Sequence, residues 1–306
     1  MTLQQLRYLC EIVNAKFNLS RAAKVLHTSQ PGVSRYMRLL ENELGLELLV
    51  RNKKRIAGLT PGGSAIAQVA QQVTSQIANL KPIAQDYQSH VSGSLTIATG
   101  HAHARYTLPK VVERFISRYP RVELRLRQGY LSQIVNWVKT GEADLLIATT
   151  PAESVPDLAL LPCHELHRVV LTLPGHPLLA KRKVSLADLA RYPIITYDSV
   201  FSAYRQIVGA FHAKNLSPNI VLSASDADIM KTYVLAGLGI TITAHTAFDK
   251  RLDTGLRSID VRHLFEPGTV HVGVRRNAYL SKHMMHFIRL FAPHLRESRI
   301  KRAFCG

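Results

Sequence analysis

Residues 17–41 combine polar and basic side chains with a tight turn, and this combination suits contact with a nucleic acid. The segment is typical of two short helices joined by a turn, with the second helix beginning near Ser29. Hydroxyl, amide and guanidinium groups on the outer face of such a helix can bond base edges and phosphates in the major groove. We expect Gln30, Ser34 and Arg35 to contact base edges, and Ser29 and Arg38 to contact phosphates.

The spacing of apolar residues indicates how this second helix is held. Its buried stripe follows steps of four, three and four residues: Val33, Met37, Leu40 and Leu44. Ser34, Arg35 and Arg38 lie off that stripe and should face outward. Pro31 fits the first turn, where its missing N–H costs nothing, and it belongs to the predicted DNA-binding surface. Gly45 is expected to end the helix.

A basic hairpin is predicted next. Leu46, Leu48 and Val50 recur at every second position as in a strand, and residues 51–55 read Arg-Asn-Lys-Lys-Arg. We expect the wing of a winged helix-turn-helix, with Arg51, Lys53 and Lys54 available to phosphates. A solvated turn remains the alternative for such a run.

The stretch from Ser64 to about Gln88 is predicted to form one long helix with a single apolar seam. The seam recurs at steps of three or four: Ile66, Val69, Val73, Ile77, Leu80 and Ala84. A long helix of this kind needs a partner, so we expect a homodimer through it, and packing on its own domain is the alternative. Pro82 should kink the helix or end it early.

Beyond residue 90, strands alternate with helices, and the βαβαβ order implies a parallel sheet covered by helices. The first strands and helices are expected at 95–98, 103–118, 122–126, 133–138 and 143–148. Later strands are expected at 168–173, 194–197, 220–223, 240–242 and 270–275, before a final helix at 282–291. The basic run 296–302 is interpreted as a solvated tail or, alternatively, as a polyanion contact within an oligomer.

Composition points to a polyanionic partner. Lys and Arg number 39 against 21 Asp and Glu, which gives a net charge of +18. Apolar runs stay well short of the roughly 20 residues of a membrane span. The first residues lack the pattern of a secretion signal, so we expect a cytoplasmic protein without membrane contact. The three cysteines suggest neither a disulfide framework nor a metal knuckle.

Possible catalytic and metal-binding groups are weak in this sequence. His101 and His103 could suggest a metal, but without a third ligand at short spacing we interpret them as pocket wall or surface loop. Asp226 and Asp228 precede a predicted helix, where capping and the helix dipole explain them. We find no serine, cysteine or threonine with a credible base partner, so an enzyme is not expected.

Taken together, the motifs resemble the LysR-type family of bacterial transcription regulators over the whole chain. The resemblance rests on Ala22-Ala23, Ser29-Gln30-Pro31, Ser34, the segment 39–45 and Thr60-Pro61-Gly62. It implies a winged helix-turn-helix domain at 1–60, with the helix-turn-helix at about 19–38, and a linker helix at 61–90. It also implies a two-lobed α/β effector domain at 91–306, similar to periplasmic binding proteins, with lobe I at about 91–162 and 268–306 and lobe II at about 163–267.

Within that family the chain looks most like the CysB and Cbl branch, whose members regulate sulfur assimilation. The stretches Thr28-Ser29-Gln30-Pro31-Gly32, Ala104-Arg105-Tyr106 and Asp226-Ala227-Asp228 are among those that carry this likeness. The resemblance implies promoter DNA as a partner, a homotetramer built from helix-linked dimers, and no cofactor. It also implies a small effector, such as sulfate or an acetylserine, bound between the lobes.

The resemblance further implies an effector site in the first strand–helix loop and at three positions beyond it. The expected residues are Thr99, Gly100, His101, Ala102, His103, Thr149, Ser202 and Thr232. Gly100 and Ala102 replace two family threonines, and His103 replaces a glutamine, whereas Thr149 and Ser202 keep a hydroxyl. An oxyanion could use backbone N–H groups at this helix start. The small residues would also leave room for a larger ligand.

Two other functions remain open. A LysR-type regulator of another pathway would sense a small organic acid. A solute-binding transport protein is the more distant alternative, and both the first 60 residues and the apparent lack of an export signal argue against it.

Overall fold

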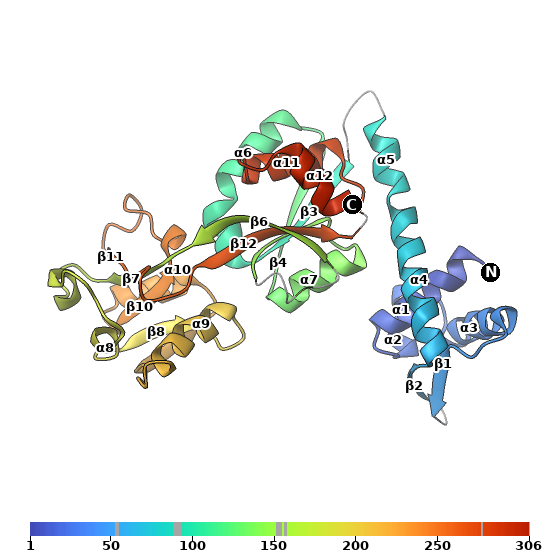
Figure 1. Cartoon of the computed structure of the whole chain (residues 1–306), viewed down its shortest axis with the longest axis horizontal. Coiled ribbons are helices and arrows are strands. Elements are labelled where there is room, and N and C mark those ends of the chain that lie inside the picture. The colour runs from blue at the N-terminus through green and yellow to red at the C-terminus, as the bar shows by residue number, and fades with distance from the viewer. Residues whose placement is uncertain (53–54, 88–92, 151–154, 156–157, 277, 306) are drawn as a thin grey trace. The chain divides into compact units, whose positions relative to one another are not determined.

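The computed structural model describes residues 1–52, 55–87, 93–150, 155, 158–276 and 278–305 (Figure 1). The chain divides into two compact units. One comprises Met1–Gln88 with Asn277–Tyr279, and the other comprises Ser89–Arg276 with Leu280–Gly306. Among the described residues, no helix is long and apolar enough to cross a membrane.

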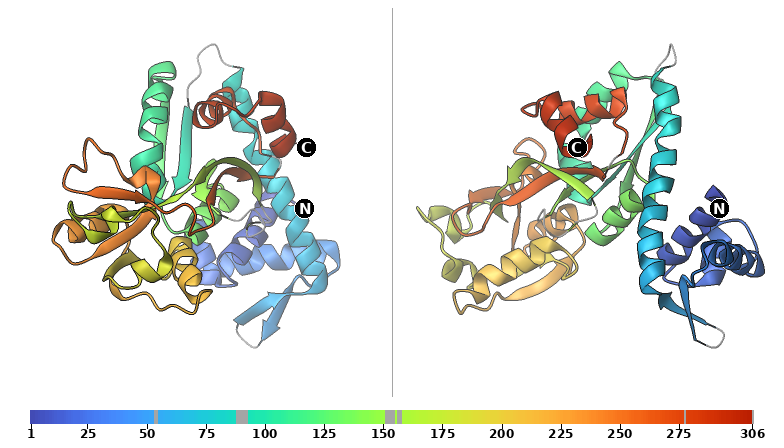
Figure 2. Two further views of the ribbon diagram at one scale, coloured as in Figure 1. Left: turned by 60° about the vertical axis from the view of Figure 1, so that its left-hand side comes forward. Right: turned by 45° about the vertical axis from the view of Figure 1, so that its right-hand side comes forward.

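The N-terminal unit begins with three helices whose first turns are capped by side chains. They are α1 (Leu3–Asn14), α2 (Leu19–Val25) and α3 (Gln30–Leu44). Thr2, Asn18 and Ser29 each accept a hydrogen bond from a backbone N–H of the following helix. Gly45 ends α3 in the left-handed conformation, as expected. Strands β1 (Leu49–Asn52) and β2 (Arg55–Leu59) then form the predicted hairpin, which projects from this unit (Figure 2).

The helix after the hairpin is interrupted, as the proline in its sequence predicts. Helix α4 covers Pro61–Ala78 and α5 covers Leu80–Asp86, with a break at Asn79. Pro82 has no N–H to donate to the carbonyl of Ala78, so the regular hydrogen-bond ladder fails one turn before it. The linker is therefore two helices rather than one continuous helix to about Gln88.

The second unit contains two five-stranded sheets, one in each lobe. Lobe I has the strand order β4-β3-β5-β12-β6, and lobe II has the order β11-β7-β10-β8-β9. The strands of lobe I are β3 (Gly93–Thr99), β4 (Val122–Gln128), β5 (Leu145–Thr149), β6 (Leu158–Leu166) and β12 (Gly268–Arg275). Those of lobe II are β7 (Arg168–Thr172), β8 (Ile194–Tyr197), β9 (Ile220–Ala224), β10 (Ile240–Ala244) and β11 (Arg257–Asp260).

The parallel arrangement expected from the βαβαβ order is confirmed for the first three strands, and the later strands add antiparallel pairs. Strands β3, β4 and β5 run parallel, but β12 pairs antiparallel with both β5 and β6. The chain leaves lobe I along β6 and returns along β12, so these two crossing strands run in opposite directions. In lobe II, β8 is parallel to β9 and β10, whereas β7 is antiparallel to β10 and β11.

Helices cover the sheets of both lobes (Figure 1). Lobe I carries α6 (Pro109–Arg118), α7 (Leu131–Thr140), α11 (Lys282–Phe291) and α12 (Glu297–Cys305). Lobe II carries α8 (Leu186–Leu189), α9 (Ser202–His212) and α10 (Ala227–Leu235), with short 3-10 turns at Pro177–Ala180 and His245–Ala247. The predicted single helix at 103–118 is divided into a π-helical turn, His103–Thr107, and α6, because Pro109 restarts the backbone ladder.

The C-terminal segment differs from its prediction. The basic run 296–302 is not a solvated tail but part of helix α12, and α11 is therefore not the final helix. Ile300 and Phe304, one turn apart, are fully buried and anchor α12 to lobe I. Only two large apolar residues identify this helix among charged neighbours, so its periodicity was too short to recognise.

Candidate nucleic-acid interface and effector cavity

Helix α3 presents the predicted contact residues on its free face. Gln30, Pro31, Arg35 and Arg38 are exposed, and Ser34 is half-buried. The Ser29 hydroxyl accepts a hydrogen bond from the Gly32 N–H at 3.2 Å, so it also caps the helix. The opposite face packs into the core through Val33, Met37 and Leu40. Leu44 does not join that stripe, because it is 37% exposed where the chain turns at Gly45.

Arg35 and Arg38 differ from Arg51 of the hairpin in their ion pairs. Within the described ranges, no carboxylate pairs with Arg35 or Arg38, so both guanidinium groups are available to a phosphate or base. Arg51 instead places its Nη2 2.6 Å from the buried carboxylate of Glu41. Lys53 and Lys54, the other predicted wing contacts, lie outside the described residues.

Glu41 of α3 holds the hairpin in place through hydrogen bonds. Its Oε1 accepts hydrogen bonds from the backbone N–H groups of Leu48 and Leu49, at 2.9 and 3.2 Å. Burial alone would raise the pKa of Glu41, but these bonds and the Arg51 guanidinium outweigh burial and hold that pKa below its usual value. Arg51 thus orients the wing whether or not it also touches a phosphate.

The linker helix α4 has two contrasting faces. Ala67 and Ala70 are buried against the N-terminal core, so one face packs on its own domain. The predicted seam is divided between the two faces: Ile66 and Val73 pack against the same core, whereas Val69 is 56% exposed, Ile77 37% and Leu80, at the start of α5, 63%. Apolar side chains in a row on a helix surface are typical of a face that another helix covers.

A cavity of about 140 Å³ lies between the lobes. It opens at the carboxyl ends of β3, β4 and β5 in lobe I and of β8 and β9 in lobe II, where loops lead into helices. Its size suits a metabolite of few heavy atoms, because pockets for drug-sized molecules measure roughly 300–1,000 Å³.

Most of the residues expected at the effector site meet at this cavity. Its lining includes Gly100, His101, Ala102, His103, Thr149 and Ser202. Thr99 does not reach it, because its side chain is fully buried and its hydroxyl donates to the Ile147 carbonyl at 2.7 Å. Thr232 lies outside the lining as well, and its exposed hydroxyl donates to the Asp228 carbonyl one turn back in α10.

The hydroxyl of Thr149 is engaged with a histidine. The Nε2 atom of His103 lies 3.1 Å from the Thr149 Oγ1. Burial, with a further contribution from His164, lowers the pKa of His103 to about 4. His103 is therefore neutral at pH 7, and it offers this wall of the cavity a polar contact without charge.

Arg168 is the charged residue of this cavity that the sequence did not reveal as part of the effector site. It lines the cavity from the start of β7 and is 7% exposed. Its Nη2 donates to the Gln206 Oε1 at 2.8 Å, and its buried Nε has no hydrogen-bond partner in the described part of the chain. Burial lowers the pKa of Arg168, but a guanidinium stays charged at neutral pH. The only signal in the sequence was a lone cation opening the apolar strand 168–173.

Helix starts add positive potential around Arg168. Helices α7, α9 and α10 begin at lining residues Leu131, Ser202 and Ala227. The residue before α9, Phe201, provides no side-chain cap, so the first N–H groups of that helix remain without one. Uncapped N–H groups and the helix dipole favour an anion. The cavity thus combines a buried cation and the uncapped start of α9 with one carboxylate, Asp226, which caps α10, inside a mostly apolar wall.

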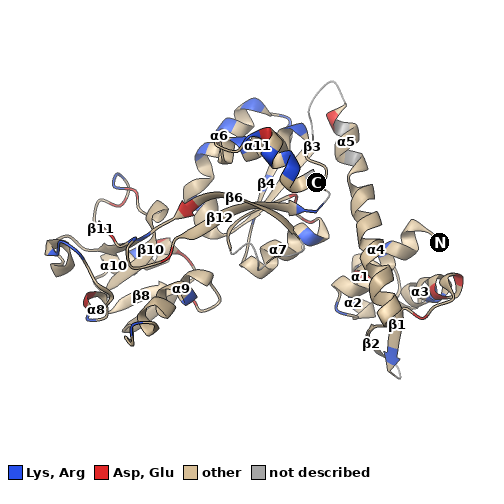
Figure 3. Cartoon of the chain, in the orientation of Figure 1, with Lys and Arg blue, Asp and Glu red and all other residues tan. Residues whose placement is uncertain are grey.

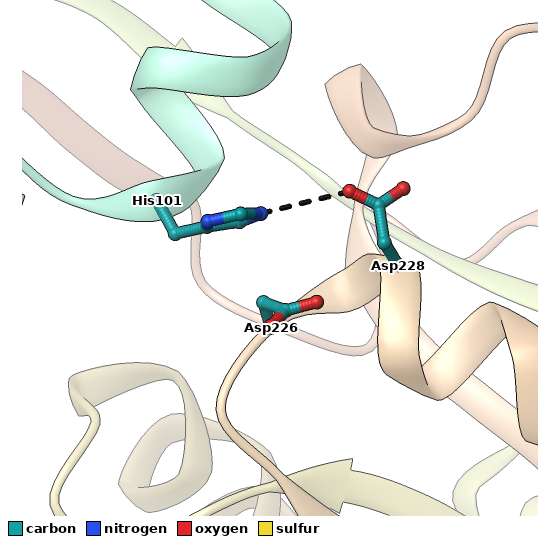
Figure 4. Close-up of side chains that lie close together, drawn as sticks. All are labelled: His101, Asp226 and Asp228. Atoms are coloured by element: carbon teal, nitrogen blue, oxygen red, sulfur yellow. Dashed lines mark ion pairs between the residues drawn. The ribbon is translucent and has the colours of Figure 1, made fainter.

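The two histidines of the first loop have different partners. His103 bonds Thr149, whereas His101 approaches Asp226 and Asp228 at the start of α10 (Figure 4). The His101 Nε2 is 3.6 Å from an Asp228 oxygen, and one ligand atom from each of these three residues lies within 4.8 Å of the others. Among the residues that the structure describes, these three could hold a metal ion, a grouping that the sequence spacing did not indicate.

Cations of the chain already compensate this carboxylate pair. Asp228 is 3.3 Å from the Arg105 Nε and 3.2 Å from the Lys231 Nζ. Burial would raise the pKa of Asp228, but the neighbouring Tyr106 and these two cations lower it overall. Asp226 caps α10 as expected, accepting from the Ile229 N–H at 2.9 Å. The cluster is best described as an ion-pair network joining the lobes.

An aromatic contact joins the lobes as well. The Tyr130 ring of lobe I meets the Phe201 ring of lobe II edge-on, with centroids 5.2 Å apart. Both residues line the cavity. A ligand between the lobes is therefore flanked by two interlobe contacts, one aromatic and one ionic.

Comparison with known proteins identifies the family. Residues 3–64 match the bacterial regulatory helix-turn-helix protein family, lysR type, and residues 88–296 match the LysR substrate binding domain. The chain belongs to the LysR family. The expectation of a transcription regulator rather than an enzyme is confirmed, and the regulator carries a DNA-binding domain and an effector-binding domain.

Two curated relatives and one solved structure are similar over most of the regulator. SsuR of Burkholderia cenocepacia is 43% identical, over 98% of this chain and 97% of SsuR. CysB of the same organism is 42% identical, over 100% of this chain and 98% of CysB. The crystal structure of the cofactor-binding domain of the Cbl transcriptional regulator is 36% identical with a TM-score of 0.67, and covers 72% of this chain and 97% of that domain.

Proposed function

We propose that this regulator controls genes of sulfur assimilation and cysteine biosynthesis in response to a small anion bound between its lobes. The pathway rests on similarity to CysB, SsuR and Cbl along nearly the whole chain. The observation that carries the class of effector is Arg168. A buried guanidinium without a carboxylate partner costs desolvation free energy, which an anionic ligand would offset.

On the DNA side, α3 enters the major groove of promoter DNA. Gln30, Ser34 and Arg35 contact base edges, while Ser29 and Arg38 contact phosphates, with Pro31 beside them. Arg51, Lys53 and Lys54 of the wing lie along the backbone. The exposure of the α3 residues and the lack of internal partners for Arg35 and Arg38 support this assignment.

In the cavity, an oxyanion accepts hydrogen bonds from Arg168 and from N–H groups at the helix starts. Ser202 supplies a hydroxyl, and Gly100 to His103 with Thr149 form the facing wall. The ligand touches both lobes, so it binds the arrangement that brings them together more tightly than any other. The Asp228 network and the Tyr130–Phe201 contact also favour the arrangement in which the two lobes come together.

The exposed seam of α4 and α5 supports a homodimer, and two such dimers would form a homotetramer. Lobe movement within the oligomer then changes the spacing of the DNA-binding heads, and with it the promoter sites that are occupied. The regulator would act in the cytoplasm, where promoter DNA lies.

Calorimetric titration of the full chain with sulfate, O-acetylserine and N-acetylserine tests the effector. Saturable binding of at least one probe is expected, together with a change in the affinity for promoter DNA. No heat from any of the three in folded protein would contradict this effector class. Mapping of the promoters occupied in cells tests the pathway separately, and occupancy confined to genes outside sulfur metabolism would contradict it.

A second candidate is a LysR-type regulator that senses a small organic acid. It is favoured by the space at Gly100, where an added Cβ would have no atom within 4 Å. A carboxylate ligand could occupy this space while keeping its contact with Arg168. Binding of succinate or benzoate, but of none of the three sulfur-pathway probes, would select this candidate.

A further inference from the structure

Lobe I carries more excess positive charge than the DNA-binding head. Residues 89–162 and 268–306 contain 16 Lys and Arg against 7 Asp and Glu, half of the net charge of +18. Residues 1–88 contain 11 against 5. A DNA-binding family accounts for the charge of the head but not for this larger excess on a sheet domain.

The charge is organised on two neighbouring helices. Lys110, Arg114 and Arg118 follow one another at steps of four along α6, so they form a single exposed ridge. On α11, His286 and Arg289 also lie on one side. The helices pack together through Phe115 and Phe287, whose ring centroids are 5.3 Å apart.

The cations of α6 and α11 come together at His286. Burial lowers the pKa of His286, and the nearby cations Arg289 and Arg118 lower it further, so both arginines lie close to this ring. Blue residues gather on α6, α11 and α12 in Figure 3. We call Lys110, Arg114, Arg118 and Arg289 the basic face of lobe I.

Little within the chain neutralises the basic face. Over the described ranges, Lys110, Arg114 and Arg118 have no carboxylate partner, and Arg289 has only Glu297, at 3.9 Å. Like charges one helical turn apart destabilise a helix unless something compensates them. The arrangement therefore fits a polyanion more than internal structure.

We propose that the basic face of lobe I binds the phosphate backbone of duplex DNA. DNA is favoured because the DNA-binding head is part of the same chain, which raises the local concentration of DNA around lobe I, and each neutralised phosphate releases counterions. A second copy of the same face is disfavoured because both surfaces are positive. Arg299 and Arg302 on α12 continue the charge beyond the face.

The test is a salt titration of the full-length regulator on a random-sequence duplex of about 60 base pairs. The variant Arg114→Gln/Arg118→Gln/Arg289→Gln removes three charges from the face. The matched control Arg182→Gln/Lys183→Gln/Lys214→Gln removes three exposed charges from lobe II. Circular dichroism checks folding, and the single variant Arg114→Gln provides a milder substitution.

The slope of log Kobs against log salt should become shallower by about 2–3 in the face variant and by about 1 in Arg114→Gln. The lobe II control should keep the slope of the unmodified protein. An unchanged slope in the face variant, or an equal loss in the control, overturns the proposal. The face variant could also keep an unchanged salt slope but lose transcription in a reconstituted system. That result would indicate that the basic face binds an acidic protein surface, and it would overturn the proposal.

Discussion

The DNA-binding head and the effector cavity use arginine in opposite settings. Arg35 and Arg38 are exposed on α3, where water solvates them and salt screens them, so each contributes modestly and several act together. Arg168 is buried in the cavity with one amide partner, and in the proposed function a single anionic ligand compensates its charge. The comparison teaches that DNA binding should respond gradually to substitution and salt, whereas effector binding should depend on one residue.

Replacing Arg168 gives the largest expected effect. Arg168→Met keeps the length and apolar stem but removes the charge, so sulfate affinity should fall roughly 100-fold or more, since a charged partner is lost in a site of low dielectric. Calorimetry of the full chain measures it, with sulfate replaced by whichever acetylserine binds best if sulfate does not. Arg182→Met, an exposed lobe II change, serves as control. Equal effector affinities of Arg168→Met and the unmodified chain would contradict the claim that effector binding depends on this one residue.

On the head, the two arginines of α3 should separate into different roles. Arg35→Ala should weaken binding to a cognate promoter by about 1–3 kcal/mol and relax its sequence preference. Arg38→Ala should weaken binding to all sequences alike and reduce the salt slope by about 1. Fluorescence anisotropy on cognate and scrambled duplexes distinguishes them. If Arg35→Ala leaves promoter affinity untouched, its assignment to base edges is wrong.

Glu41 can be compared with Arg168, because both are buried charges but the partner of Glu41 is supplied by the chain. Its pKa is lowered in the folded state, so its stabilisation is complete above the usual value of 4.5 and is lost as pH falls through the lowered value. Glu41→Gln should cost roughly 1–2 kcal/mol at pH 7. Denaturant unfolding of both proteins from pH 7 to pH 3 should show the difference shrinking below about pH 4.5. A constant difference would contradict the ion pair with Arg51.

The smallest effect is expected from restoring a hydroxyl to the cavity. Gly100→Thr meets open space at its Cβ and should be tolerated. One added hydrogen bond of about 1 kcal/mol would raise sulfate affinity about fivefold. Gly100→Val, nearly the same shape without the hydroxyl, is the control. A gain of the same size in both variants would point to packing rather than to hydrogen bonding.

The head was largely predictable from sequence, and the cavity only in part. Helix α3 follows from local signals, a cap at Ser29, an apolar stripe and Gly45, so its outward residues could be named. The loop 100–103 was found through family resemblance. Arg168 could not be found, because its function depends on two lobes meeting and no local pattern distinguishes it from a strand terminus. The contact of Arg105 with Asp228 joins segments far apart in the chain for the same reason.

Because of the apolar seam of the linker, the stability of the regulator should depend on its own concentration. Val69, Ile77 and Leu80 face water in the single chain, and covering them in a dimer favours the folded state by mass action. The melting temperature should therefore rise with protein concentration, and dilution alone should act as a destabilising stress. A cell that makes few copies would hold a larger share of exposed, protease-sensitive chains, so gene dosage would set both how much regulator is made and how long it survives.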